Sequence, residues 1–214
     1  MVERWFFLQS PAANAAFNMA LDETLLRHAV KRGAPLLRVY AWDKPAVSFG
    51  YFQRFPGHLA GKYELVRRPT GGGIVYHGDD VDTTYTIVVP PDHRLHRLTT
   101  TEAYTTIHEV VARVTGAALQ IAGNPPRGNY ECFQQPVAGD VMADGRKLAG
   151  GAQRRNRDGM LHQGSIAARV TGEQLCRAFG VTFVPYSLTG EEKSSANQLA
   201  VEKYATDAWN QRVR

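Results

Sequence analysis

The chain has 214 residues, of which 43% are hydrophobic and 21% are charged, so it can bury a substantial core and is not expected to be disordered. It has no apolar run of about 18 residues, which argues against a membrane span. The net charge of +5 favours an acidic protein partner, and because no nucleic-acid-binding motif accompanies the basic residues, we expect no binding of nucleic acid.

The first half of the chain is predicted to form a long helix followed by short strands. Apolar residues at helical spacing, such as Leu21 and Leu25, predict an amphipathic helix over Asn14–Arg32 that ends before Gly33. Strands are expected at Leu36–Trp42, Ala46–Tyr51, Glu64–Arg68, Ile74–His77 and Asp82–Val89, each bounded by turn residues.

The second half is predicted to contain three helices around a group of strands. The expected elements are a helix over Thr99–Leu119, a loop at Asn124–Gly128, two or three short strands across Glu131–Ala168, a helix opening at Thr171 and a closing helix from Ser195. Strands in adjacent groups with helices between them favour an α+β fold, and residues 1–214 fit a single domain. The N-terminal MVERWFFLQSP lacks the features of a secretory signal, so a cytoplasmic location is expected.

The segment RRPTGGGIVYH, Arg67–His77, carries three successive glycines between two predicted strands. Glycines there pack nothing and cost backbone entropy, which makes sense where the main chain must approach a ligand or adopt positive φ. Their N–H groups could then bind a carbonyl oxygen or a phosphate. A loose hairpin turn is the alternative, and the spacing is not that of a Walker A loop.

A second unusual segment, GRKLAGGAQRRNRDGMLHQGS, runs from Gly145 to Ser165 and places Lys147 just before two glycines and an alanine. Those small residues would leave space for a substrate chain beside the lysine. The alternative is an ordinary exposed lysine at a strand edge. His77 and His162 are candidate proton acceptors, or else hydrogen-bonded structural histidines.

The two cysteines of the chain have different surroundings in the sequence. Cys132 stands beside the polar Gln134-Gln135-Pro136, where a loop is expected, and a nearby cation such as Lys147 would favour the nucleophilic thiolate. Cys176 lies in a helical pattern and is expected in the core. Two cysteines without histidine pairs predict neither a structural disulfide in the cytosol nor a metal site.

Taken together, these segments resemble the lipoate-protein ligase and octanoyltransferase superfamily. The resemblance extends over most of the chain and is carried by Ala15–Leu26, Leu36–Gln53, Arg67–His77, Asp140–Arg155 and Leu161–Ile166. It implies the fold of the biotin and lipoate protein ligase catalytic domain, with a central, mixed and mostly antiparallel sheet flanked by helices. Within this superfamily, Cys132 resembles the cysteine of the cysteine-dependent octanoyltransferases, which ligases generally lack.

The resemblance also implies roles for single residues and for partners. Cys132 and Lys147 would be catalytic; the substrate would be bound by Arg68, Thr70, Gly71, Gly72, Gly73, His77, Gly150, Gly151, Ala152 and His162. The octanoyl group would pass from acyl carrier protein through a cysteine thioester to a lysine of a lipoyl domain of a 2-oxoacid dehydrogenase or of the glycine cleavage H protein. No cofactor, metal or membrane would be involved.

Two other functions stay open. The first is an ATP- and Mg-dependent lipoate-protein ligase that forms an acyl-adenylate. Gly73 completes a TGGG sequence that is common in ligases, and Asp140 matches the acidic residue of their Asn-Asp motif, although Gly139 replaces the asparagine. The second is a non-catalytic protein that binds lipoyl domains or acyl carriers.

Overall fold

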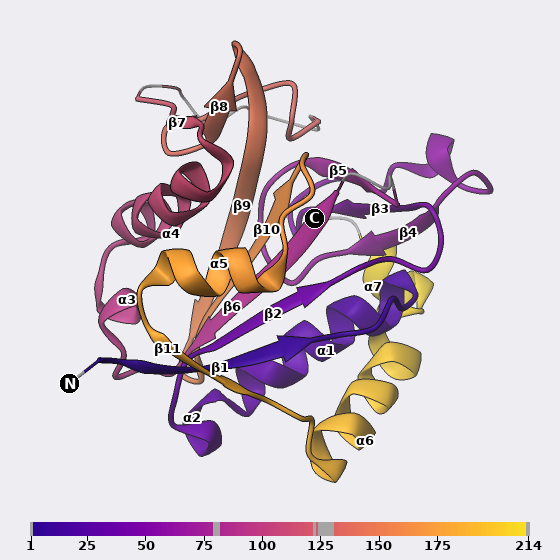
Figure 1. Cartoon of the computed structure of the whole chain (residues 1–214). Helices are drawn as coiled ribbons and strands as arrows, with labels where there is room; N and C mark the ends of the chain where they lie inside the picture. Colours follow the sequence, from indigo (N-terminus) through magenta and orange to yellow (C-terminus); the bar gives the residue numbers. More distant parts are fainter. Residues whose placement is uncertain (1, 79–81, 122, 124–130, 213–214) are drawn as a thin grey trace.

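A computed structural model describes residues 2–78, 82–121, 123 and 131–212 of the chain (Figure 1). The loop expected at Asn124–Gly128 lies outside the described residues. Within them, no helix is both long enough and apolar enough to cross a membrane.

Eight strands of the described chain form the main sheet, in the order β11-β1-β2-β6-β10-β9-β8-β7. They are β1 Arg4–Gln9, β2 Leu36–Tyr40, β6 Thr83–Val89, β7 Ala118–Leu119, β8 Val141–Ala143, β9 Arg146–Asn156, β10 Gly159–Ile166 and β11 Thr182–Pro185. The β11-β1-β2 pairings are parallel and the others are antiparallel, which confirms the expected mixed and mostly antiparallel sheet. β1 and β11, which pair with each other at one end of this sheet, were not predicted.

A second sheet of three strands packs beside the first in the described residues, in the order β4-β3-β5. Its strands are β3 Ala46–Phe49, β4 Glu64–Arg67 and β5 Ile74–His77, and the 3-10 turn η1 Gly57–Leu59 precedes β4. β3 pairs with β4 in parallel and with β5 in antiparallel orientation, so the glycine segment between β4 and β5 crosses over the end of β3. The sequence predicted these strands but not their separation into a sheet of their own.

Helices cover both faces of the main sheet (Figure 1). The helices are α1 Ala15–Arg27, α2 Ala29–Arg32, α3 Arg94–Arg97, α4 Thr100–Thr115, α5 Gly172–Phe179, α6 Gly190–Leu199, the π-helical turn η2 Ala200–Tyr204 and α7 Asp207–Asn210. Leu37 in β2 packs with α4 and α5, whereas its neighbour Leu36 packs with α1 and α6, because successive strand residues point to opposite faces.

Three helix predictions need correction. The helix expected over Asn14–Arg32 is interrupted at His28, which ends α1 and precedes the short α2. The helix expected over Thr99–Leu119 stops at Thr115, because Gly116 takes a left-handed φ of 67° and the chain then forms β7. The closing helix starts at Gly190 rather than Ser195; Thr189 caps it and Glu192 completes a capping box.

Candidate functional site

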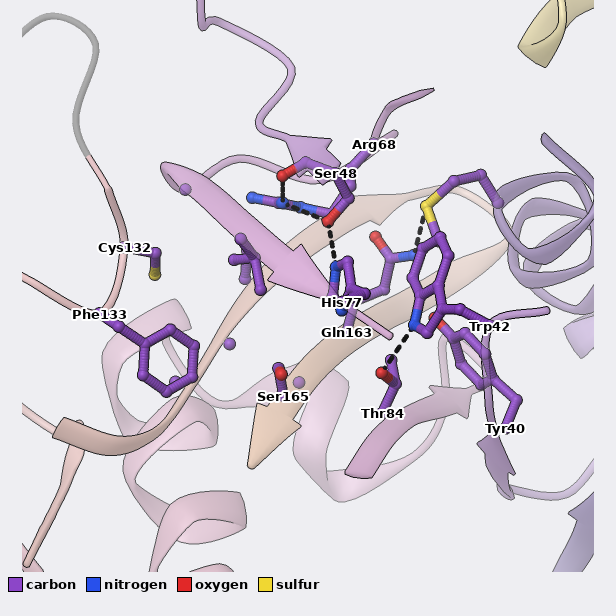
Figure 2. Close-up of a pocket in the computed structure, with 17 residues that line it drawn as sticks. Tyr40, Trp42, Ser48, Arg68, His77, Thr84, Cys132, Phe133, Gln163 and Ser165 are labelled. Atoms are coloured by element: carbon purple, nitrogen blue, oxygen red, sulfur yellow. Dashed lines mark hydrogen bonds between the residues drawn. The ribbon is translucent and has the colours of Figure 1, made fainter. Parts of the chain in front are cut away.

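A cavity lies between the two sheets (Figure 2). Its walls are formed by Met19, Tyr40, Trp42, Ser48, Arg68, Gly72, Val75, His77, Thr84, Cys132, Phe133, Gly150, Gly151, Ala152, Gln163, Gly164 and Ser165. Figure 2 shows Cys132 and Phe133 at one side of the cavity and Tyr40 and Trp42 at the other. Small residues of β9 face small residues of β10 across the sheet, since Gly150 pairs with Ser165 and Gly151 with Gly164. They leave space above the sheet for an elongated apolar group.

The glycine segment is held over this cavity by the buried side chain of Arg68. Its Nη2 donates to the carbonyl oxygens of Gly71 at 2.9 Å and Gly73 at 2.7 Å, and its Nη1 donates to Ser48. Gly72 has a φ of 84°, which a residue with a side chain rarely adopts. Its carbonyl oxygen would be 1.9 Å from a Cβ at Gly50, so the loop needs glycine on both sides of this contact.

Cys132 and Lys147 are in contact at one side of the same cavity. The Nζ of Lys147 lies 3.2 Å from the Sγ of Cys132 and 2.8 Å from Oδ2 of Asp140. The Lys147 side chain is only 2% exposed and that of Asp140 is completely buried. The head group of Lys147 therefore contacts the carboxylate and the sulfur at once, and Asp140 orients it toward Cys132.

The positions of Cys132 and Lys147 depend on a backbone hydrogen bond and on a glycine. The N–H of Cys132 donates to the carbonyl oxygen of Ile74 at 2.8 Å, which ties the cysteine turn to the start of β5. A Cβ at Gly150 would lie 2.4 Å from Cε and 2.5 Å from Nζ of Lys147. Glycine at position 150 therefore gives the lysine head the space in which it reaches Cys132. Lys147 is buried, so the alternative of an ordinary exposed lysine at a strand edge is wrong.

His77 lies in a polar cluster on the cavity wall. Its Nε2 is 2.7 Å from Oγ of Ser48, and its ring stacks on Trp42 with a centroid separation of 4.1 Å. Arg68 donates to the same hydroxyl, and Nδ1 of His77 is buried with no hydrogen-bond partner in the described part of the chain. Burial, and secondarily the charge of Arg68, lower the pKa of His77 to about 3. At neutral pH this imidazole is a weak base.

His162 occupies the opposite face of β10 and does not line the cavity. It lies against Tyr85, Tyr104 and His108, with ring centroids 5.4 Å apart for the histidine pair. Burial, and then the neighbouring His108, hold the pKa of His162 well below its usual range. A Cβ at Gly151 would come within 2.7 Å of Nε2 of His162, so that glycine makes room for the ring.

Gln163, the residue after His162, faces the cavity and was not singled out from the sequence. Its Oε1 accepts from Thr70 at 2.7 Å, and its Nε2 donates to Asp22 at 2.7 Å. Asp22 in turn pairs with the fully buried Arg38 at 2.6 Å. This network connects α1 through β10 to the glycine segment, so Thr70 supports the loop from outside the cavity.

The structure thus brings most of the predicted site residues to one cavity. Those that line it are Arg68, Gly72, His77, Cys132, Gly150, Gly151 and Ala152, with Lys147 in contact with Cys132. Thr70, Gly71 and Gly73 belong to the supporting loop, whereas His162 lies behind the sheet. Cys176 is half-buried against the core formed with α4, and burial raises the pKa of its thiol to about 12.

Two octanoyltransferases are similar to this chain in sequence. Octanoyltransferase LipM of Bacillus cereus is 32% identical over 97% of this chain and 98% of its own length. LipM of Oceanobacillus iheyensis is 37% identical over 84% of this chain and 69% of its own length.

Solved structures that share the fold include a chain from the structural analysis of a bi-partite lipoate protein ligase and its E2 lipoyl domain from Thermoplasma acidophilum. The TM-score is 0.69, with 22% identity over 99% of this chain and 96% of that one. For LipL1 of P. falciparum in complex with lipoate, the TM-score is 0.62. The identity is 17%, over 98% of this chain and 75% of that one. The model of the lipoyl protein ligase A/B catalytic domain matches residues 14–188. The chain therefore belongs to the lipoyl protein ligase A/B catalytic domain family.

Proposed function

We propose that this acyltransferase moves an octanoyl group from acyl carrier protein through a thioester on Cys132 to a lysine of an acceptor protein. The acceptor would be a lipoyl domain of a 2-oxoacid dehydrogenase or the glycine cleavage H protein. The observation that carries the proposal is the contact of 3.2 Å between Lys147 Nζ and Cys132 Sγ at the wall of an apolar cavity. The octanoyltransferase activity named for the relatives in Bacillus supports the same acyl group and reaction.

In the first step the Cys132 thiolate attacks the carbonyl carbon of the octanoyl thioester. A new carbon–sulfur bond forms, and the thiolate of the carrier protein leaves with the electron pair of the bond that breaks. Lys147 stabilises the attacking thiolate and then the negative oxygen of the tetrahedral intermediate, because its charge is buried and already oriented by Asp140. The alkyl chain would lie in the cavity, where each buried CH₂ contributes about 0.8 kcal/mol.

In the second step the amine of the acceptor lysine attacks the enzyme thioester. An amide forms and the Cys132 sulfur leaves; overall, one proton passes from the amine to the sulfur and regenerates the thiol. Thioester to amide is downhill, so the proposed cycle needs no nucleotide or metal. Splitting the transfer also means that the two protein substrates never need to occupy the enzyme together.

The buried surroundings of Asp140 support this cycle over adenylate chemistry. Its Oδ1 accepts from the Tyr104 hydroxyl at 2.6 Å, and its Oδ2 accepts from Lys147 and from the Val137 N–H. Both oxygens of the carboxylate are therefore engaged by the protein itself. A Mg²⁺ ion would have to displace these donors before the carboxylate could bind it.

The test compares two acyl sources with one acceptor. Purified enzyme and a lipoyl domain are incubated either with octanoyl carrier protein without ATP, or with free octanoate, ATP and Mg²⁺. We expect acylated acceptor in the first mixture only, and none from Cys132→Ala. Acylation that requires ATP, uses the free acid and survives Cys132→Ala would instead establish a ligase.

A further inference from the structure

The carboxylate that holds Lys147 is itself held by a tyrosine from the far side of the sheet. Tyr104, in α4, donates its hydroxyl proton to Oδ1 of Asp140 at 2.6 Å. The same hydroxyl oxygen accepts the N–H of Gly151 at 3.0 Å. Gly151 lines the cavity. One hydroxyl group therefore links the counter-ion of the lysine to the cavity wall.

Neighbouring residues fix the position of the Tyr104 ring, and its hydroxyl stays protonated. A Cβ at Gly139, whose φ is 87°, would lie 2.9 Å from Cδ1 of Tyr104, so the chain before Asp140 leaves the ring just enough room. The ring packs on His108 with a centroid separation of 4.0 Å. Burial, and then the charge of Asp140, raise the pKa of Tyr104 well above its usual value, so the hydroxyl remains a donor.

Loss of this hydroxyl would affect the lysine through the carboxylate. Oδ1 of Asp140 would become a buried, charged oxygen that has lost its donor, which is strongly unfavourable. The carboxylate could then turn both oxygens toward Lys147, the cation it already contacts. The ammonium would move toward the carboxylate and away from the sulfur of Cys132, which it now reaches at 3.2 Å.

We infer that Tyr104 is a positioning residue for the first acyl transfer, because through Asp140 it fixes Lys147 against Cys132. The inference rests on the proposed function, in which Cys132 takes the acyl group. Tyr104 touches neither the sulfur nor the acyl chain in this role. Its effect must therefore appear in the reactivity of Cys132 and must disappear when Asp140 or Lys147 can no longer transmit it.

The experiment measures Tyr104→Phe, which removes only the hydroxyl. The two readouts are the single-turnover formation of octanoyl-enzyme at varied concentrations of octanoyl carrier protein, and the rate of Cys132 alkylation by iodoacetamide at pH 7. We expect both maximal rates to fall about tenfold, with the half-saturating donor concentration unchanged within about twofold. Tyr85→Phe is the matched control, because its hydroxyl lies 3.3 Å from His162 on the same face and does not contact Asp140.

A double-mutant comparison separates positioning from general structural support. In an Asp140→Asn background, Tyr104→Phe should change the alkylation rate less than about twofold. If Asp140→Asn does not fold, as judged by circular dichroism, Lys147→Met provides the equivalent background. An unchanged alkylation rate in Tyr104→Phe, or an undiminished effect in the double variant, would overturn the inference. A wild type that forms no octanoyl adduct refutes the proposed function, whereas the alkylation ratios still test the role of Tyr104.

Discussion

The Nζ of Lys147 lies 3.2 Å from the Sγ of Cys132, although the two residues come from different elements and are 15 positions apart in the chain. Lys147 belongs to β9, whereas Cys132 lies in a turn anchored to β5 of the second sheet. The contact therefore joins the two sheets at one side of the cavity. It depends on how the two sheets pack, and any change that alters this packing should alter the reactivity of the thiol.

Removing the charge of the lysine should impair the chemistry, and it should also destabilise the fold because the buried Asp140 loses its cation. In Lys147→Met the side chain keeps an unbranched apolar stem, but the cation beside the sulfur is lost while Asp140 stays buried. We expect acyl-enzyme formation to fall about 100-fold or more, as for loss of one stabilising group at a developing oxyanion. Single-turnover mass spectrometry measures this rate. A loss smaller than about threefold would show that Lys147 has no part in the transfer.

Gly150 offers a way to move the lysine without removing it. In Gly150→Ala the new Cβ would stand 2.4 Å from Cε of Lys147, a flexible end that can shift. We expect the protein to fold, with alkylation of Cys132 by iodoacetamide slowed about tenfold. Gly190→Ala is the control, because a Cβ there meets nothing within 4 Å and φ is not positive. Equal alkylation rates for the two variants would contradict the role assigned to Gly150.

A larger side chain at Ala152 should block the acyl chain selectively. Ala152 lines the cavity opposite the glycine segment, and its Cβ would be 3.5 Å from a Cβ at Gly72. In Ala152→Leu we expect kcat/KM for the octanoyl thioester to fall at least about tenfold, which corresponds to about 1.4 kcal/mol. The small reagent iodoacetamide should still reach Cys132 at the wild-type rate. An unchanged octanoyl rate would place the acyl chain elsewhere.

The buried histidines predict how stability depends on pH. Burial lowers the pKa of His77 to about 3 and that of His108 to about 4, against about 6.5 in the unfolded chain. Below pH 6.5 the unfolded chain binds protons that the folded protein does not, so stability is complete above that pH and falls toward pH 4. At pH 5 each such histidine removes about 2 kcal/mol.

Urea unfolding at pH 7.5 and pH 5 measures this loss. His108→Asn keeps a donor for the carbonyl oxygen of Gly139, which Nδ1 of His108 contacts at 2.7 Å, but it no longer titrates. The variant should lose less stability than the wild type between the two pH values. An identical loss would mean that His108 is protonated in the folded state.

Much of the site could be predicted from the sequence, because successive glycines and a lone lysine before small residues are unusual. The role of Tyr104 could not, since a tyrosine in an amphipathic helix carries no sign of its contact with Asp140. His162 and Gln163 could not be assigned to faces either. All of β10 is buried on both faces, so the strand lacks the alternation that would show which side chain points into the cavity.

The fold, like the site, could be predicted in part from the sequence. Most predicted strands match the structure to within a few residues, because Gly and Pro mark their ends. β1 was missed because RWFFLQ shows no alternation of apolar and polar residues, and β11 because it has only four residues. The end of α4 depends on Gly116 in a left-handed conformation, which a continuing apolar pattern concealed.

The measurement that tests the central claim most directly is intact mass spectrometry after incubation with octanoyl carrier protein in the absence of ATP. We expect an octanoyl adduct on the wild type that hydroxylamine removes, peptide mapping that places it on Cys132, and transfer of the group when a lipoyl domain is added. Cys132→Ala should show no adduct. A wild type that acylates the lipoyl domain without ever forming an adduct, or an adduct that Cys132→Ala retains, would contradict the thioester mechanism.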